Sequence, residues 1–249
     1  MEKQAHIGID GSHGATIALL PGDPARVEVI ARHLQNPRFF AQNREYTTWL
    51  GELPCGETIM VMSTGMGGPS TAICVEELYK TGVRDFIRIG TCGGMDTKVT
   101  GGNVVIATGA IRMEGTTREY VPIEFPAVAD LDVTNALAAA ARDAGFAYHT
   151  GIVQCKDSFY GQHDPARMPA GYELESKWQA WLKARCLASE MESAALYIVC
   201  QILGARGGCV LSVVWNQERK KAGLPDPECH DPSNAIITAV RAAEILARR

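Results

Sequence analysis

The chain has 249 residues, of which 46% are hydrophobic and 21% are charged. That composition is typical of a globular protein and excludes disorder, collagen and coiled coil as descriptions of the whole chain. The formal net charge of −4 argues against a general binder of nucleic acid, which would carry a basic surface. A small anion needs only a few local cations and is not excluded.

We expect one domain over residues 1–249, because no linker or low-complexity tract interrupts the sequence. The longest uncharged run, from Thr58 to Val75, contains Gly and Pro residues, and this excludes a membrane helix. The N-terminus lacks the pattern of a signal peptide. None of the 8 cysteines forms a CxxC pair, which favours reduced thiols in a cytoplasmic protein.

Short apolar segments alternate with segments of helical periodicity, and this pattern is typical of an α/β fold. In chain order we expect a strand at 15–20, a helix through 27–34, a strand at 58–64, a helix at 69–81, and strands at 85–90 and 104–108. A helix at 133–145, a strand at 151–155, helices at 173–183 and 190–203, a strand at 209–215 and a helix at 234–249 follow. Pro69 suits the first position of its helix, and Gly82 ends it.

Gly-rich or polar turns follow four of the predicted strands: PGDP (21–24), STGMGG (63–68), IGTCGG (89–94) and VVWNQ (213–217). Ligands of open α/β sheets bind at the carboxyl ends of the strands. We therefore expect these four segments along one functional rim. The STGMGG turn lacks the GK[ST] ending of a P-loop, so ATP binding is not supported. The histidines show neither HExxH nor paired-ligand spacing, which argues against catalytic zinc.

Three of these regions have two interpretations each. Arg26, after PGDP, either helps the glycine loop to bind an anion or lies solvated in a connector. Arg88 lies inside an apolar strand and needs a buried carboxylate or a phosphate. Glu192 either closes an S-x-x-E capping box with Ser189 or projects from a helix start to bind hydroxyls.

The segment FYGQH (159–163) joins aromatic side chains to an amide and a histidine. Gln162 offers both a donor and an acceptor, which suits the amide edge of a nucleobase, and a neighbouring ring could stack on that base. The other interpretation is a polar surface loop.

The order of the motifs carries more information than any one of them. PGDPARV, NREYTTW (43–49), STGMGGPSTAICVEEL (63–78), IRIGTCGG (87–94), FPAVAD (125–130), FYGQ and SEMESAAL closely resemble the uridine-cleaving members of the nucleoside phosphorylase-I family. The resemblance runs from about His6 to the last helix. It implies a three-layer αβα fold with a mixed central sheet and a homohexamer built as a trimer of dimers. The implied reaction is phosphorolysis of uridine or deoxyuridine, with phosphate as co-substrate and no organic cofactor, in pyrimidine salvage.

The resemblance also implies roles for individual residues. For phosphate it implies Gly22, Arg26, Arg88 and Thr91, with Arg44 supplied across a subunit interface. For ribose it implies Met191 and Glu192, with His6 from the neighbouring subunit, and for uracil Phe159 and Gln162. Glu45, Met66 and Ser70 match a site for a monovalent cation such as K⁺. The catalytic roles fall to Arg88, Thr91, Glu192 and Gln162.

The base-binding motif departs from the usual bacterial pattern. Asp164 and Gln217 stand at two positions where arginines are expected. Lys156, His163 and Arg167 are candidates to replace them, and we favour Lys156 with His163 because both lie near Gln162. Asn216 stands where purine-cleaving relatives have an Asp that protonates the base, and this favours a pyrimidine substrate. A nucleoside hydrolase and a non-catalytic nucleoside-binding protein remain the alternatives.

Overall fold

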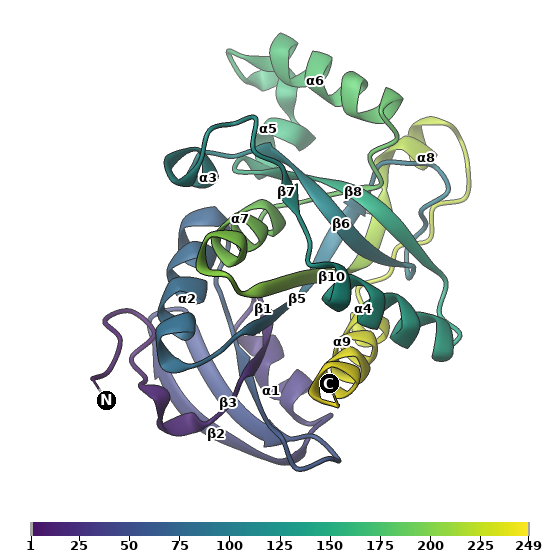
Figure 1. Cartoon of the computed structure of the whole chain (residues 1–249). Helices are drawn as coiled ribbons and strands as arrows, with labels where there is room; N and C mark the ends of the chain where they lie inside the picture. Colours follow the sequence, from purple (N-terminus) through teal and green to yellow (C-terminus); the bar gives the residue numbers. More distant parts are fainter. Residues whose placement is uncertain (1, 249) are drawn as a thin grey trace.

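The computed structural model describes residues 2–248, which form one mixed sheet with helices on both faces (Figure 1). Among these residues the sheet has ten strands, nine of them in the order β10-β6-β8-β9-β5-β1-β4-β3-β2, with β7 paired to β6. Their bounds are β1 Ile17–Pro21, β2 Gln35–Asn43, β3 Tyr46–Glu52, β4 Thr58–Met62, β5 Asp85–Gly94, β6 Val104–Met113, β7 Ala127–Val128, β8 Tyr148–Lys156, β9 Ala188–Glu190 and β10 Arg206–Asn216.

The sheet closes on itself around β5. This strand pairs in parallel with β1 and β10 and antiparallel with β9. Strand β10 pairs antiparallel with β6, which runs parallel to β8, and β8 runs parallel to β9. The five strands β5, β10, β6, β8 and β9 therefore form a ring, while β4, β3 and β2 extend the sheet beyond β1.

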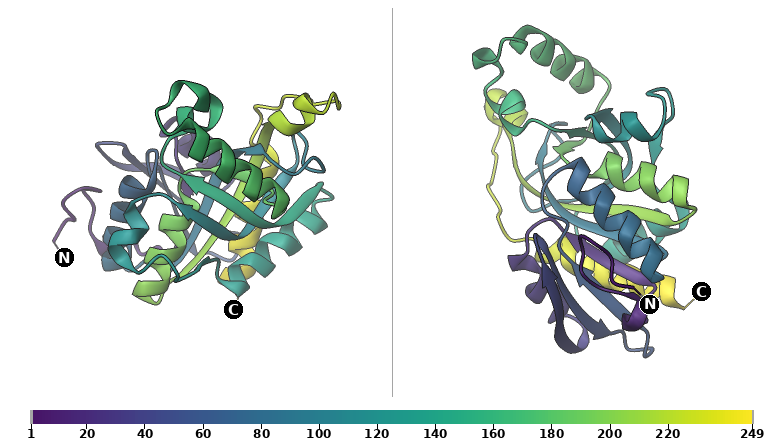
Figure 2. Two further views of the ribbon diagram at one scale, coloured as in Figure 1. Left: turned by 90° about the horizontal axis from the view of Figure 1, so that it is seen from above. Right: turned by 90° about the vertical axis from the view of Figure 1, so that its left-hand side faces the viewer.

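Alternation along β1 divides the core between two faces of the sheet. Ile17 and Leu19 belong to a core with helices α1 (Ala25–Ala31), α4 (Leu131–Asp143) and α9 (Ser233–Ala247). Ala18 and Leu20 belong to a second core with α2 (Gly68–Thr81) and α7 (Ser193–Leu203). Figure 2 shows these helix layers on either side of the strands. The expected three-layer αβα fold with a mixed sheet is confirmed.

The remaining helices surround the strand ends. They are η1 (Gly11–His13), α3 (Thr116–Tyr120), α5 (Phe159–His163), η2 (Pro165–Arg167), α6 (Gly171–Lys183) and α8 (Gln217–Lys221). Helix α6 projects from the body (Figures 1 and 2) and buries only Gly171 and Trp178 of its own residues. Within residues 2–248 no helix is both long enough and apolar enough to cross a membrane.

The structure differs from the expected elements in three instructive places. The hairpin β2–β3 was not predicted, because the β2 segment QNPRFFAQN is mostly exposed and carries no apolar period. The helix expected from residue 190 begins only at Ser193, since Ala188–Glu190 is a strand. The segment 159–163, for which a polar loop was one interpretation, forms the short helix α5 and is capped by the Ser158 hydroxyl.

Candidate active site

A cavity of about 880 Å³ opens where the strands of the sheet end. Residues from all four turns that we expected on one rim line it: Gly22, Asp23 and Pro24, Gly65 and Met66, Gly90 to Gly93, and Val214 and Trp215. Helix α5 and the segment between β9 and α7 also contribute to the lining. The cavity therefore collects segments that lie far apart in the sequence.

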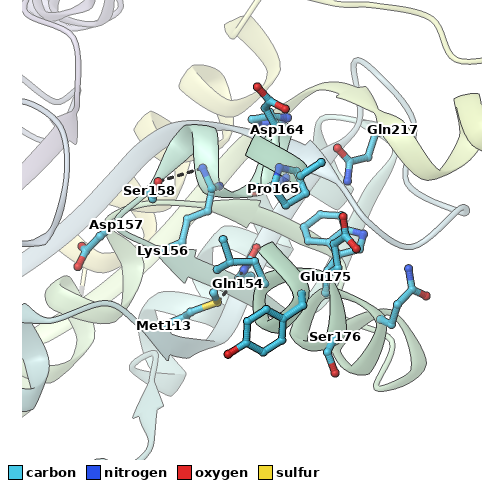
Figure 3. Close-up of a pocket in the computed structure, with 18 of the residues that line it drawn as sticks. Met113, Gln154, Lys156, Asp157, Ser158, Asp164, Pro165, Glu175, Ser176 and Gln217 are labelled. Atoms are coloured by element: carbon cyan, nitrogen blue, oxygen red, sulfur yellow. Dashed lines mark hydrogen bonds between the residues drawn. The ribbon is translucent and has the colours of Figure 1, made fainter. Parts of the chain in front are cut away.

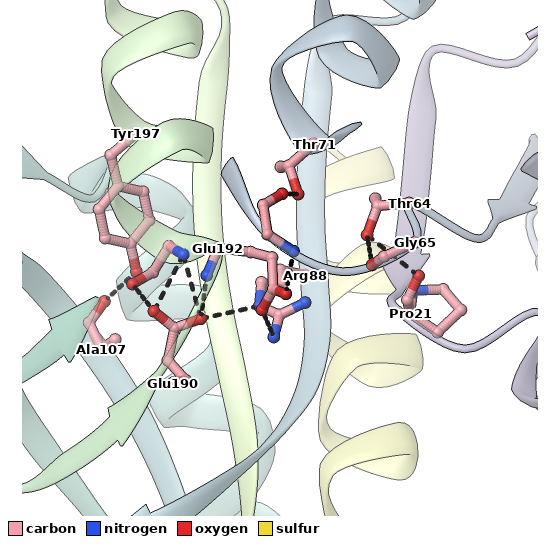
Figure 4. A network of polar contacts seen from close by, with 11 residues as sticks. Pro21, Thr64, Gly65, Thr71, Arg88, Ala107, Glu190, Glu192 and Tyr197 are labelled. Carbon is pink, nitrogen blue, oxygen red and sulfur yellow. Dashed lines mark hydrogen bonds and ion pairs between the residues drawn. The ribbon is translucent and has the colours of Figure 1, made fainter. Parts of the chain in front are cut away.

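Arg88 lies buried on β5 at the centre of the polar network in Figure 4. Its Nε donates to Glu190 at 3.1 Å, and its Nη2 forms an ion pair with Glu192. Its Nη1 is also buried and has no hydrogen-bond partner among residues 2–248. A buried donor without a partner is costly, so Nη1 marks a place for an acceptor that enters the cavity.

Glu190 and Glu192 have different tasks. The Glu190 carboxylate accepts from the backbone N–H groups of Glu192 at 2.9 Å and Ser193 at 3.0 Å, and so satisfies the start of α7. Glu192 instead accepts from the Gly67 N–H at 2.7 Å and faces Arg88. The capping-box interpretation of Ser189 and Glu192 is therefore wrong, because Glu190 performs the capping.

Burial raises the pKa of Glu192, with a further contribution from the charge of Glu190, while Arg88 acts in the opposite direction. Its two oxygens already accept from Gly67 and Arg88, and each carboxylate oxygen has a second lone pair. Glu192 lines the cavity and can therefore accept from a hydroxyl of a bound ligand.

Gly22, Arg26 and Thr91 line the same cavity as Arg88. A Cβ at Gly22 would lie 3.1 Å from the Gly65 carbonyl oxygen and 3.9 Å from Arg88 Nη1, so a side chain there would crowd the free donor. Arg26, one residue into α1, is partly exposed. These residues and Arg88 form the part of the cavity that is suited to an anion.

Aromatic side chains form the opposite part of the cavity. The ring centroid of His163 lies 4.3 Å from that of Phe159 and 5.6 Å from that of Trp215. Burial, and secondarily the charge of Lys156, lowers the pKa of His163, which favours a neutral imidazole. Gln162 lies on α5 beside these rings. The arrangement combines flat surfaces with an amide, as a planar heterocycle requires.

Lys156 ends β8 and is buried beside Gln162. Its Nζ donates to the Ser189 hydroxyl at 2.6 Å. Burial lowers the pKa of Lys156, while Glu190 and Glu192 act in the opposite direction. Arg167, by contrast, is exposed, forms an ion pair with Asp164 at 3.0 Å and does not line the cavity.

Glu45, Met66 and Ser70 also meet at this cavity. The Ser70 hydroxyl lies 2.7 Å from a carboxylate oxygen of Glu45 and also contacts the Thr64 carbonyl oxygen. The hydrogen bond from Ser70 lowers the pKa of Glu45. Oxygen atoms of this kind fit a hard monovalent cation, whereas the thioether of the exposed Met66 does not.

Two of the expected site residues do not line the cavity of their own chain. His6 lies at the surface with its Nδ1 2.6 Å from Glu77. Arg44 is exposed in the turn between β2 and β3, where its φ is +51°.

Asn216 also lies outside the cavity lining and is fully buried. Its amide nitrogen donates to the Asp96 and Val99 carbonyl oxygens at 2.8 Å, and its oxygen accepts from the N–H groups that begin α8. The side chain has a structural task and presents nothing to a base.

The structure adds four lining residues that the sequence did not single out for this site: Ser189, Glu190, Trp215 and His230. Glu190 and Ser189 stand within the SEMES motif, so their position was visible but their separate tasks were not. Trp215 lies within the predicted rim. His230, exposed and 2.7 Å from Glu228, follows no recognisable motif.

The comparisons with known proteins agree with this geometry. The model of the phosphorylase superfamily matches residues 16–248. A uridine phosphorylase of Treponema pallidum is 53% identical over 97% of this chain and 93% of its own length, and that of Escherichia coli is 38% identical over 97% of both. A guanosine phosphorylase of Halorubrum lacusprofundi is also 38% identical, over 98% of this chain and 97% of its own. The chain belongs to the phosphorylase superfamily.

Proposed function

We propose that this chain is a phosphorylase that converts uridine or deoxyuridine and phosphate into uracil and the sugar 1-phosphate. The observation that carries the proposal is the buried Nη1 of Arg88, which has no partner among residues 2–248 and adjoins Gly22. Glu192 pairs with the same guanidinium, and the aromatic residues line the same cavity. One cavity thus offers an anion site, a hydroxyl acceptor and a flat surface.

In this proposal Arg88, Arg26, Thr91 and the backbone at Gly22 bind phosphate. The guanidinium of an arginine donates directional hydrogen bonds to phosphate oxygens and can form two at once. Glu192 and Met191 bind the ribose. The hydrogen bonds that Glu192 accepts from the ribose hydroxyls strengthen as positive charge develops on the sugar.

The bond between C1′ and N1 breaks, and its electron pair stays with the base. A phosphate oxygen forms the new bond to C1′, and the proton that phosphate gives up balances the one that uracil gains. Gln162, Lys156 and His163 donate to the base oxygens on which negative charge collects, while Phe159 packs against the ring. Holding both substrates in one cavity supplies much of the acceleration.

A pyrimidine fits this site better than a purine. The amide of Asn216 is occupied by four backbone partners, so the residue at this position cannot protonate a purine nitrogen. This observation favours uridine, although a guanosine phosphorylase is among the relatives.

We further propose that Arg44 and His6 serve the cavity of a second copy, in a hexamer built from three dimers of a single-domain chain. Both side chains lie at the surface and outside their own cavity, which supports this assignment. Glu45, Ser70 and the backbone near Met66 would hold a monovalent cation such as K⁺. All eight cysteines are free thiols, which supports localisation in the reducing environment of the cytoplasm.

The test is to follow uridine with and without phosphate. We expect uracil and ribose 1-phosphate only when phosphate is present. Cleavage without phosphate would identify a hydrolase, and uridine binding without cleavage in either condition would identify a binding protein. Guanosine, supplied in parallel, should react far more slowly than uridine; the reverse order would contradict the assignment of the base.

A further inference from the structure

Ser189 is the middle residue of β9, and its buried side chain lines the cavity beside the proposed base-binding residues. Its hydroxyl oxygen lies 2.6 Å from Lys156 Nζ, 2.7 Å from Gln162 Oε1 and 2.8 Å from Gln154 Oε1. A second cavity, of about 890 Å³, has Gln154 and Lys156 in its wall (Figure 3). It shares Lys156, Gln162 and His163 with the first cavity.

Counting hydrogens decides how this cluster works. A lysine ammonium only donates, so Ser189 Oγ accepts from Lys156. A serine hydroxyl has one hydrogen, and two amide oxygens lie within reach of it. With both amides oriented as in the structure, only one of Gln154 and Gln162 can accept this hydrogen at a time.

The two glutamines differ in what else can satisfy them. Gln154 donates through Nε2 to Met113 Sδ at 3.1 Å. Its side chain lines the second cavity (Figure 3), which water can fill, but not the first. Gln162 lines both cavities, and a base bound in the first cavity displaces water from that side of its amide and takes the Nε2–H groups as donors. Once the base is present, Gln162 is the glutamine that needs the Ser189 hydrogen.

We infer that Ser189 is a positioning residue of the base site: it takes a hydrogen bond from Lys156 and gives its own hydrogen to Gln162 Oε1. This fixes the Gln162 amide with its oxygen toward Ser189 and its Nε2–H donors toward the base. The donors of Gln162 and the remaining donors of Lys156 then face the oxygens of the departing base together. The inference rests on the proposed function, since it concerns the base that this cavity binds.

The experiment compares Ser189→Ala with wild type, varying uridine and phosphate separately. Loss of a hydrogen bond that leaves a buried polar group unsatisfied corresponds to about a 10- to 100-fold fall in kcat/KM for uridine. The KM for phosphate should stay within about twofold, because the arginines are untouched. Thr238→Val is the matched control: it removes a buried hydroxyl whose hydrogen-bond partner within residues 2–248 is the Asn234 carbonyl oxygen of its own helix.

A double-mutant cycle shows whether Ser189 acts through Gln162. In a Gln162→Ala background, Ser189→Ala should cost less than about threefold further. Equal losses with and without Gln162 would overturn the inference, as would an unchanged kcat/KM for uridine in Ser189→Ala.

Calorimetry with uracil keeps the two proposals separate. If wild type binds uracil but cleaves no nucleoside, the proposed function fails, and weaker uracil binding by Ser189→Ala would still support the inference. If wild type is a phosphorylase and Ser189→Ala binds uracil equally well, only the inference fails.

Discussion

Replacing Arg88 with lysine keeps the positive charge but removes the fork of nitrogens. The substitution therefore separates the contribution of charge from that of hydrogen-bond geometry. In the structure, Nε serves Glu190 at 3.1 Å, Nη2 serves Glu192 and Nη1 has no partner among residues 2–248. A lysine has one nitrogen at its end, and this nitrogen would be drawn to the two carboxylates. We therefore expect Arg88→Lys to lose the donor that faces phosphate.

The expected effect follows from the worth of one hydrogen bond to a charged group, about 1.5 to 3 kcal/mol. At 1.36 kcal/mol per factor of ten, this is roughly a 10- to 150-fold rise in the KM for phosphate. The KM for uridine should change much less. Initial rates at saturating uridine with varied phosphate, and the reverse, measure both values.

A second buried arginine provides the control. Among the residues that the structure describes, the Arg112 side chain donates to Thr117 and to the backbone carbonyl oxygens of Val121, Pro122 and Phe125. Arg112→Lys should therefore lower the free energy of unfolding while leaving the KM for phosphate unchanged. An Arg88→Lys enzyme that is folded and has the wild-type KM for phosphate would refute the assignment of Arg88.

Three further outcomes are expected. Lys156→Met should raise the KM for uridine about tenfold or more without changing the KM for phosphate. Because the substitution removes a buried charge, urea unfolding of this variant should show no loss of stability. Gly101→Ala would put a Cβ 1.8 Å from the Pro227 carbonyl oxygen, so urea unfolding should show a loss of about 1 to 3 kcal/mol. Burial lowers the pKa of His13 in the folded chain. As the pH drops below about 6.5, His13 therefore binds a proton more readily in the unfolded chain than in the folded one, and the free energy of unfolding falls. The urea midpoint at pH 7.5 and pH 5.5 measures this fall, which should shrink in His13→Gln.

The sequence predicted those parts of the fold that carry a strong apolar signal. Strand β1 and helix α2 were located because the first is uniformly apolar and Pro69 and Gly82 bound the second. Strand β3 alternates buried and partly exposed residues, a signal that was present but not used. Strand β2 has no such signal, since its partner β3 rather than its own side chains holds it in the sheet.

For the site, local patterns predicted which residues matter better than how they are connected. An arginine inside an apolar strand required a carboxylate or an acceptor from a ligand. Arg88 forms ion pairs with two carboxylates, and its Nη1 remains available as a donor. That Glu190 rather than Glu192 caps α7 depends on where β9 ends, which no local pattern encodes. The Lys156–Ser189–Gln162 chain joins β8, β9 and α5, so only the packed fold brings it together.

The charges around the cavity support the proposal that a second copy contributes to phosphate binding. Its lining has three cations, Arg26, Arg88 and Lys156, and four carboxylates, Asp23, Glu45, Glu190 and Glu192. Arg88 is largely neutralised by the two carboxylates it touches, so it offers phosphate a directed donor more than net charge. An exposed cation such as Arg44, contributed by another copy, would make the charge of the cavity more favourable for an anion. Phosphate affinity should therefore be the first property to weaken when dilution dissociates the proposed assembly.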